Sequence, residues 1–424
     1  MADFHQEGKV TSFHDLYRVF DPAEYLVNLE GRLLNYSRKT KITLLLPCHY
    51  TELENREVLD RIVEKVRETK YLRNVVIAFN GTDEEEKFNN AKEYFAQLRT
   101  SKRNVTLVWV NGPRVQEVFN RISEKDILTG VQGKGQSVWI ALGYILAKRD
   151  SDVIALHDCD IVTYDRLLLG RLIEPTANPH ADYEFCKGYY VRISPTERAM
   201  KGRVTRLFIT PFVDTMTDIM NERGFHELGR FFAYHRTFKY PLSGEFSFTA
   251  RLAREINIAY DWSLEVSTLS EVYHRVMDRK VAQVDLVSNY EHRHQVLSHD
   301  DDSKGLSKMT IDIAKFYLHY MRAHGFPLDD SIVDMMLHTY YSNALKFIKC
   351  YSDDAEMNGL GFDRYEEEMM AQHFRTLLWT AWEQSRGPTE APLIPSWNRV
   401  TYSIPDIYKH LLDSVKKDNG QKAR

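Results

Sequence analysis

The sequence VIALHDCD, residues 153–160, decides the fold, because a short apolar run stops there at two acidic residues. A continuous apolar run of this length, without alternation, is typical of a strand that is buried on both faces of a parallel sheet. In open α/β sheets, ligands bind beyond the carboxyl ends of the strands. Asp158 and Asp160 therefore stand where a ligand site is expected.

Three more apolar runs precede this one, and each ends at residues that are typical of turns. Between the runs, the segments 55–68 and 136–148 carry apolar residues at helical spacing. Strands that alternate with helices of this length predict an α/β fold with a parallel sheet. The three runs are 42–46 (ITLLL), ending at Pro47, 75–79 (VVIAF), ending at Asn80 and Gly81, and 105–110 (VTLVWV), ending at Asn111.

The alternation weakens after residue 160, and the chain divides into parts of different character. Residues 185–191 and 281–286 are further candidate strands, and the apolar residues beyond 308 mostly follow the helical period. We therefore predict a helical lead-in over 1–40, one half of an α/β domain over 41–160, a mixed second half over 161–307 and a helical C-terminal region over 308–424.

The composition excludes several classes of protein. The chain has 424 residues, of which 43% are hydrophobic and 27% charged, and this balance is typical of a globular protein. Its net charge of -4 gives no indication of nucleic-acid binding or of attraction to a membrane surface. No apolar run is long enough to span a bilayer, and the four scattered cysteines form no CxxC pair. We expect a soluble, cytoplasmic protein.

The two aspartates after residue 156 carry the strongest chemical signal. Carboxylates are ligands that suit Mg²⁺ or Mn²⁺, and these cations often bring a phosphate group with them. An isolated DxD tripeptide is more often a solvated turn, but Asp158 and Asp160 directly follow a buried strand. A metal site and a solvated turn both stay open on this pattern alone.

Three further segments combine groups that suit anions or metals. Gly-Lys-Gly at 133–135 opens a helical segment, where the helix N-terminus and the Lys134 ammonium favour an anion. KGRVTR at 201–206 joins three cations and a hydroxyl, a set that can hold phosphate. EHRHQ at 291–295 offers imidazoles for a metal and Arg293 for phosphate. Each segment, taken singly, can also be an ordinary polar turn.

The order of these motifs resembles that of a retaining nucleotide-sugar glycosyltransferase of the GT-A fold, and within that class the glucosyl-3-phosphoglycerate synthase family. The resemblance implies a Rossmann-like nucleotide-sugar-binding half over 41–160, an acceptor-binding half over 161–307 and a helical extension. The similar stretches are GKGQSVW (133–139), Asp158-Cys159-Asp160, GRVTRL (202–207), Ser243-Gly244-Glu245-Phe246 and Glu291-His292-Arg293.

The resemblance also implies roles for individual residues. Asp160 and His292 would ligate a divalent metal, Mg²⁺ or Mn²⁺. Glu265 and Arg203 would be the catalytic residues, with Glu265 hydrogen-bonded to sugar hydroxyls of the donor. Arg203, Thr205 and His294 would bind the acceptor, although the family has asparagine where this chain has His294. The donor-binding residues would be Pro47, Glu52, Asn80, Gly81, Lys134 and Asp158.

The activity implied by the resemblance is transfer of a hexose to the 2-hydroxyl of 3-phosphoglycerate. The hexose would be glucose from UDP- or GDP-glucose, the product would serve glucosylglycerate synthesis, and the helical region could support a homodimer. Residues 79–83 (FNGTD) are shorter than the family's nucleotide-side motif, so the base preference stays open. Without an evident nucleophile, we expect front-face attack by the acceptor, and Glu245 and Glu265 are the candidates for a covalent route.

Three other functions remain open at this level. One is mannosyl-3-phosphoglycerate synthesis from GDP-mannose. The second is a sugar-nucleotide pyrophosphorylase, which would need a glycine-rich, arginine-containing loop after the first strand, where this chain has Pro47-Cys48-His49-Tyr50. The third is a non-catalytic nucleotide-sugar-binding protein.

Overall fold

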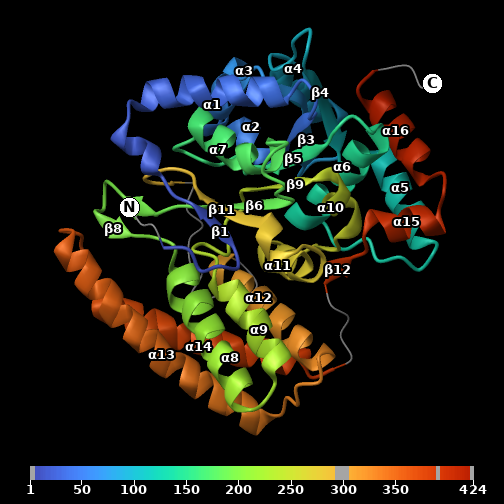
Figure 1. Cartoon of the computed structure of the whole chain (residues 1–424). Helices are drawn as coiled ribbons and strands as arrows, with labels where there is room; N and C mark the ends of the chain where they lie inside the picture. Colours follow the sequence, from blue (N-terminus) through green and yellow to red (C-terminus); the bar gives the residue numbers. More distant parts are fainter. Residues whose placement is uncertain (1–4, 292–304, 388–391, 421–424) are drawn as a thin grey trace.

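An eight-stranded sheet forms the centre of the computed structural model, which describes residues 5–291, 305–387 and 392–420 (Figure 1). The strands follow the order β1-β11-β6-β9-β5-β2-β3-β4. Neighbouring strands are parallel except at β9, which is antiparallel to both β5 and β6. The strands are β1 (Thr11–Phe13), β2 (Ile42–His49), β3 (Leu72–Asn80), β4 (Asn104–Trp109), β5 (Val153–Leu156), β6 (Phe185–Tyr189), β9 (Phe246–Thr249) and β11 (Val281–Asp285).

The four apolar runs of the sequence are β2, β3, β4 and β5, and the segments between them are helices. Helix α3 (Glu57–Glu68) has one buried face, whereas α6 (Lys134–Lys148) is buried from Gly135 to Ala147. The reason is that α6 packs on β2 and β3 with one side and on α10 and α16 with the other. The predicted α/β class, with a mostly parallel sheet and a helical C-terminal region, is confirmed.

Helices cover both faces of the sheet and form two separate apolar cores with it. Helices α1, α3, α4 and α7 supply one core, and α5, α6, α10, α11, α15 and α16 supply the other. The elements not yet bounded are α1 (Pro22–Tyr36), α4 (Glu85–Ala96), α5 (Pro113–Ser123), α7 (Arg166–Ala177), α10 (Ala250–Glu255), α11 (Leu264–Arg275), α15 (Trp397–Ser403) and α16 (Ile407–Asp418).

A third core holds a helical layer that lies below the sheet in Figure 1. It combines the middle of the chain with residues from beyond 308, because α8 and α9 pack with α12, α13 and α14. Its elements are the π-helix η2 (Val204–Ile209), α8 (Thr210–Glu222), α9 (His226–Arg236), α12 (Gly305–Ala323), α13 (Asp330–Met357) and α14 (Arg364–Ser385).

The last helices of the chain return to the sheet half instead of extending this layer. The Trp397 ring stacks on Trp139 of α6 with a centroid distance of 4.5 Å, and its Nε1 donates to the Trp139 carbonyl at 2.9 Å. The predicted region 308–424 therefore packs in two places. The proposed boundaries of the four parts stay a prediction.

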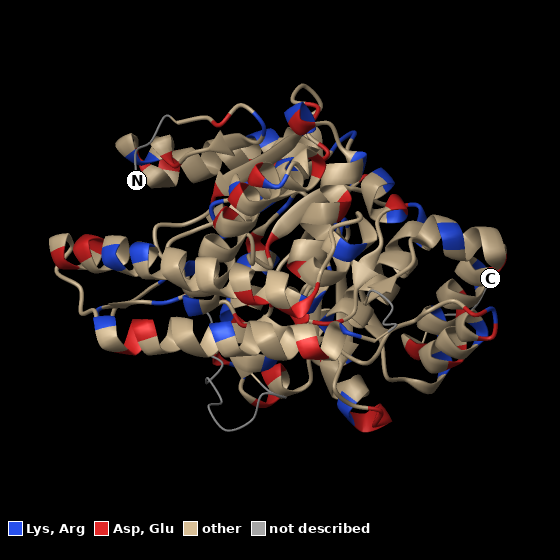
Figure 2. Cartoon of the chain, turned by 90° about the horizontal axis from the view of Figure 1, so that it is seen from below, with Lys and Arg blue, Asp and Glu red and all other residues tan. Residues whose placement is uncertain are grey.

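Short elements complete the fold and border the functional region. A hairpin of β7 (Ile193–Ser194) and β8 (Ala199–Met200) follows β6, and β10 (Ile258–Ala259) pairs with β12 (Leu393–Ile394). Basic and acidic residues are interspersed along the ribbon in Figure 2, in agreement with the small net charge. In the described ranges no helix combines the length and apolarity that a membrane crossing needs.

Candidate active site

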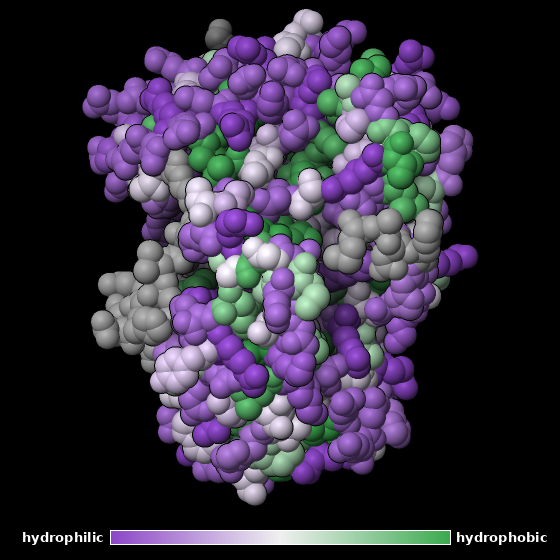
Figure 3. Space-filling view, turned by 90° about the vertical axis from the view of Figure 1, so that its left-hand side faces the viewer, coloured by the Kyte–Doolittle hydropathy of each residue, from purple (hydrophilic) through white to green (hydrophobic). Residues whose placement is uncertain are grey.

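A cavity of about 1410 Å³ extends from the carboxyl ends of β2, β3 and β5 to the helical layer. The face seen in Figure 3 is mainly hydrophilic, with apolar side chains in the recesses between the two halves of the molecule. Because β9 runs antiparallel to its neighbours, the turn before it, at Ser243 and Gly244, comes to the same edge of the sheet as Asp158. All the predicted site residues that the structure describes line this cavity except Gly81.

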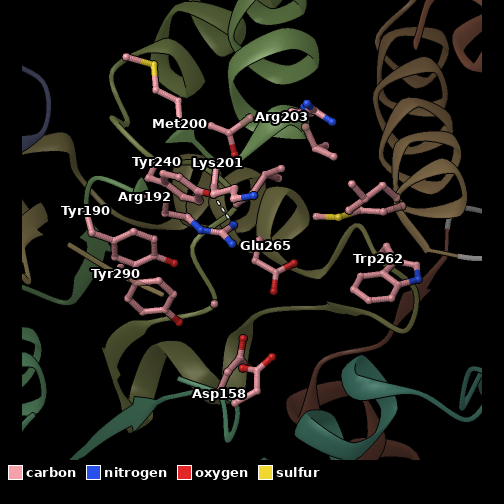
Figure 4. A pocket seen from close by; sticks show the side chains of 18 of the residues that line it. Asp158, Tyr190, Arg192, Met200, Lys201, Arg203, Tyr240, Trp262, Glu265 and Tyr290 are labelled. Carbon is pink, nitrogen blue, oxygen red and sulfur yellow. Dashed lines mark hydrogen bonds between the residues drawn. The ribbon is translucent and has the colours of Figure 1, made fainter. Parts of the chain in front are cut away.

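A lysine between two carboxylates forms the centre of one end, which we call the donor end. Lys134 is the first residue of α6, Asp158 follows β5 and Glu265 lies in the first turn of α11. The Lys134 Nζ lies 2.7 Å from the Asp158 Oδ1 and 3.1 Å from the Glu265 Oε1. Any side chain at residue 244 would collide with the Asp158 carboxylate, which explains the glycine there. Figure 4 shows Asp158 and Glu265 facing the same space.

Burial and mutual attraction set the charges of this group. Burial raises the pKa of Asp158 to about 6, and the Lys134 ammonium opposes that rise. Burial also opposes the charge on Lys134, but Asp158 and Glu265 outweigh it and raise the pKa of that ammonium. The Lys134 ammonium therefore stays charged and can attract an incoming diphosphate.

Two carboxylates of the donor end suit a divalent metal. Asp158 and Asp160 both line the cavity, and Mg²⁺ is usually held by one or two carboxylates together with phosphate oxygens and water. Within the described ranges no group of three or more metal-binding side chains occurs. His292, the other predicted ligand, and His294 lie outside the described residues. The donor set that is present fits a metal that also binds a diphosphate.

The predicted nucleoside residues lie at the ends of β2 and β3. Pro47, Glu52 and Asn80 line the cavity, and the Asn80 Nδ2 donates to the Ser137 Oγ at 2.7 Å. Gly81 lies just behind this wall, where its N–H donates to the Asn111 Oδ1 at 2.9 Å. The structure thus brings these residues together beside the start of α6.

Glu245 is buried behind the cavity and supports its wall. Its carboxylate accepts hydrogen bonds from the Tyr290 hydroxyl at 2.7 Å, the Tyr190 hydroxyl at 2.9 Å and the Ser243 hydroxyl at 3.1 Å. Both tyrosine rings line the cavity and stack with a centroid distance of 3.7 Å. Of the two carboxylates considered for covalent catalysis, only Glu265 therefore faces the cavity.

Arg203 lies at the other end of the cavity, which we call the acceptor end, and is already paired there. Its Nε donates to the Glu367 Oε1 at 3.0 Å and its Nη2 to the Glu366 Oε1 at 2.7 Å. Burial opposes the charge, but Glu367 and Glu366 outweigh it and raise the pKa of Arg203. Arg206 donates to the Glu367 Oε2 at 2.7 Å, while Thr205 is buried in the same wall. Helix α14 thus neutralises the cation that the sequence predicts to bind phosphate.

No protein-family model matches the chain. Curated proteins do: it is 36% identical to a glucosyl-3-phosphoglycerate synthase of Persephonella marina over 422 residues, which cover 99% of this chain and all of that protein. A synthase of the same name from Methanococcoides burtonii is 35% identical over 98% of both chains. The chain belongs to the glucosyl-3-phosphoglycerate synthase family. It is therefore a glycosyltransferase, and the enzyme class predicted from the motifs is confirmed.

Solved structures of a glucosyl-3-phosphoglycerate synthase from Mycobacterium tuberculosis are more distant. One, with Mn²⁺, uridine diphosphate and glucosyl-3-phosphoglycerate, is 20% identical, has a TM-score of 0.48 and covers 71% of this chain and 85% of that chain. Another, with Mg²⁺ and uridine diphosphate, is 17% identical, has a TM-score of 0.49 and covers 76% and 88%.

Several residues that line the cavity of this glucosyl-3-phosphoglycerate synthase family member were not predicted. Arg192 and Tyr240 lie in its wall together with residues from the start of α14 (Figure 4). Arg192 closely follows the end of β6, so the rule that singled out Asp158 could have found it. Nothing in the sequence links Glu366 and Glu367 to Arg203, more than 160 positions away.

Proposed function

We propose that this chain transfers glucose from a nucleoside diphosphate glucose, UDP- or GDP-glucose, to the 2-hydroxyl of 3-phosphoglycerate with retention at the anomeric carbon. The observation that carries the proposal is the near full-length identity with two relatives named for this synthesis. The cavity supports it, because its donor end has the carboxylates and lysine suited to a sugar diphosphate and its acceptor end has arginines and Thr205.

At the donor end, the chain's own residues bind and orient the sugar nucleotide. Pro47, Glu52 and Asn80 form the wall for the nucleoside, and Lys134 offers its ammonium to the diphosphate. Asp158 and Asp160 would hold a divalent metal, which when bound neutralises charge that develops on the leaving diphosphate. Glu265 accepts hydrogen bonds from sugar hydroxyls and, as a partner of Lys134, fixes the direction of that ammonium.

The reaction we propose needs no carboxylate nucleophile. The acceptor hydroxyl approaches the face of the sugar that the diphosphate leaves, and the departing phosphate oxygen takes its proton. Glu245 is held by three hydroxyl donors behind the wall, so it has no access to the anomeric carbon. A glycosyl adduct on Glu265, trapped with a slow donor analogue and located by mass spectrometry, would replace this route by a covalent one.

A donor screen tests the proposal. UDP-glucose, GDP-glucose and GDP-mannose are each incubated with 3-phosphoglycerate, with Mg²⁺, with Mn²⁺ and with a chelator, and the product anomer is assigned by NMR. We expect metal-dependent glucosyl transfer with an unchanged anomeric configuration. Preference for GDP-mannose would favour the mannosyl alternative, and no transfer from any donor would refute the proposal.

A further inference from the structure

Five cationic side chains line the cavity in the described part of the chain, and four of them are already paired with carboxylates. Such pairing satisfies the charge and reduces the attraction that each cation exerts on an incoming anion. The four pairs are Lys134 with Asp158 and Glu265, Lys201 with Glu197, Arg203 with Glu366 and Glu367, and Arg364 with Glu368.

Arg192 is the exception. Its Nη1 donates to the Tyr240 hydroxyl at 3.1 Å, and within the described residues this neutral group is the hydrogen-bond partner of the side chain. The Nε is buried without a hydrogen-bond partner, and no described carboxylate forms an ion pair with this guanidinium. A guanidinium stays charged in proteins, and holding it away from water costs free energy unless an anion is near.

The surroundings of Arg192 favour an anion. Its carbonyl accepts the Lys201 N–H at 2.9 Å, which ties it to the segment that begins η2. The Tyr240 hydroxyl lies against Gly202, where a Cβ would come within 3.0 Å of the oxygen and where φ is +77°. The helix formed by η2 and α8 starts just beyond, and the first N–H groups of a helix have no partner within it.

We propose that Arg192 binds the phosphate of the acceptor and that Tyr240 positions its guanidinium. This inference rests on the proposed function and assigns the anion contact of its acceptor. Two N–H groups of a planar guanidinium can donate to two oxygens of one phosphate. The phosphate dianion also supplies the negative charge that no described carboxylate supplies to Arg192. Figure 4 shows Arg192, Tyr240 and Lys201 across the cavity from Asp158, as a transfer between two substrates requires.

Steady-state kinetics of Arg192→Gln test the assignment. The KM for 3-phosphoglycerate should rise by about tenfold or more, because a charge-assisted contact is lost, while the KM for the nucleotide sugar stays unchanged. Tyr240→Phe should raise the acceptor KM by about threefold, since the charge remains but its orientation is less fixed. Arg198→Gln, on the exposed turn of the same hairpin, is the matched control and should leave both constants unchanged.

Acceptor analogues show which anion Arg192 binds. With glycerol 3-phosphate, which lacks the carboxylate, Arg192→Gln should raise the acceptor KM by the same factor as with 3-phosphoglycerate. With glycerate, which lacks the phosphate, it should have little effect. The opposite pattern would assign the residue to the carboxylate and overturn the proposal.

The outcomes separate this inference from the proposed function. Absence of transfer by the native enzyme would refute the proposed function. Calorimetric titration of 3-phosphoglycerate into the native protein and into Arg192→Gln would then still test whether Arg192 binds this compound. Turnover by the native enzyme with an unchanged acceptor KM in Arg192→Gln would refute the inference alone. If the glutamine variant does not fold, Arg192→Lys keeps the charge, removes the planar donors, and should raise the acceptor KM while UDP binding is retained.

Discussion

The two ends of the cavity are built in different ways. The donor end uses the carboxyl ends of neighbouring strands and the start of α6, so Asp158, Lys134 and Asn80 come together through the parallel sheet itself. The acceptor end joins the β7–β8 hairpin and η2 to α14, whose glutamates come from far along the chain. One end thus follows from a local rule of α/β folds, and the other depends on packing between remote segments.

This difference predicts where substitutions change chemistry and where they change stability. At the donor end the polar groups line the cavity, so a substitution there changes the groups that face a substrate. At the acceptor end Glu367 is buried and holds two arginines, so the same kind of change removes support from a wall.

The largest effect is expected at the donor end from Asp160→Asn. Loss of one of the two carboxylates that we propose to hold the metal should lower kcat by about a thousandfold, equivalent to about 4 kcal/mol, because charge on the leaving diphosphate is less well neutralised. Unfolding by denaturant should be nearly unchanged. Metal-dependent UDP affinity, measured by calorimetry, should fall in parallel, and retained affinity would remove Asp160 from the metal site.

A smaller effect is expected from Glu265→Gln. The change keeps the size of the side chain but removes a charged acceptor and one partner of Lys134, so kcat should fall by about a hundredfold. The KM for 3-phosphoglycerate should not change. A selective rise in the acceptor KM would instead show that Glu265 contacts the acceptor, and the two ends would not bind separate substrates.

The sequence could predict the donor end because its signals are local. Apolar runs that stop at polar residues predicted β2, β3, β4 and β5, and residues at or just beyond the carboxyl ends of β2, β3 and β5 line the cavity. The antiparallel strand β9, at the centre of the sheet, was not predicted. Its four residues, FSFT, are too short for their pattern to show either direction or neighbours.

The acceptor end could be predicted only in part. The basic residues of KGRVTR suggested a phosphate site, and Arg203 and Thr205 do line the cavity. Their charge balance was not predictable, because it depends on Glu366 and Glu367 in a helix that the sequence marks only by its period. Arg192 and Tyr240 likewise meet through tertiary packing between two segments that have no shared motif.

Glu367→Gln tests whether the acceptor wall depends on this packing. The substitution weakens hydrogen bonds with two guanidiniums, so we expect the free energy of unfolding to fall by about 2 kcal/mol. Glu368→Gln, one residue further along α14, removes a more exposed pair with Arg364 and should cost less than about 0.5 kcal/mol. Equal losses in urea denaturation would show that the buried contact adds nothing to the wall.

The smallest expected effect is on the pH dependence of stability. Each half of the molecule contains a buried histidine that can contribute to it. His157 follows β5 at the donor end, and His235 lies in α9 of the helical layer. Burial holds the pKa of each at about 3, below the ordinary value of 6.5. The unfolded chain therefore binds more protons than the folded chain between these values, so stability falls as the pH is lowered below 6.5.

His235→Gln should reduce this acid sensitivity without affecting the donor site. The ring is fully buried between the Tyr317 hydroxyl, 2.9 Å from its Nδ1, and the Ser270 hydroxyl, 3.3 Å from its Nε2, and glutamine can bond to both without a titrating group. Below pH 6 the free energy of unfolding, measured by urea denaturation, should fall less steeply in the variant than in the native protein. The difference should be about 1.4 kcal/mol per pH unit. His226→Gln, on the exposed start of α9, controls for the change of residue type. An unchanged slope would contradict the assignment to His235, whereas a reduced slope with an unchanged KM for the nucleotide sugar would confirm that acid weakens the helical layer independently of the donor end.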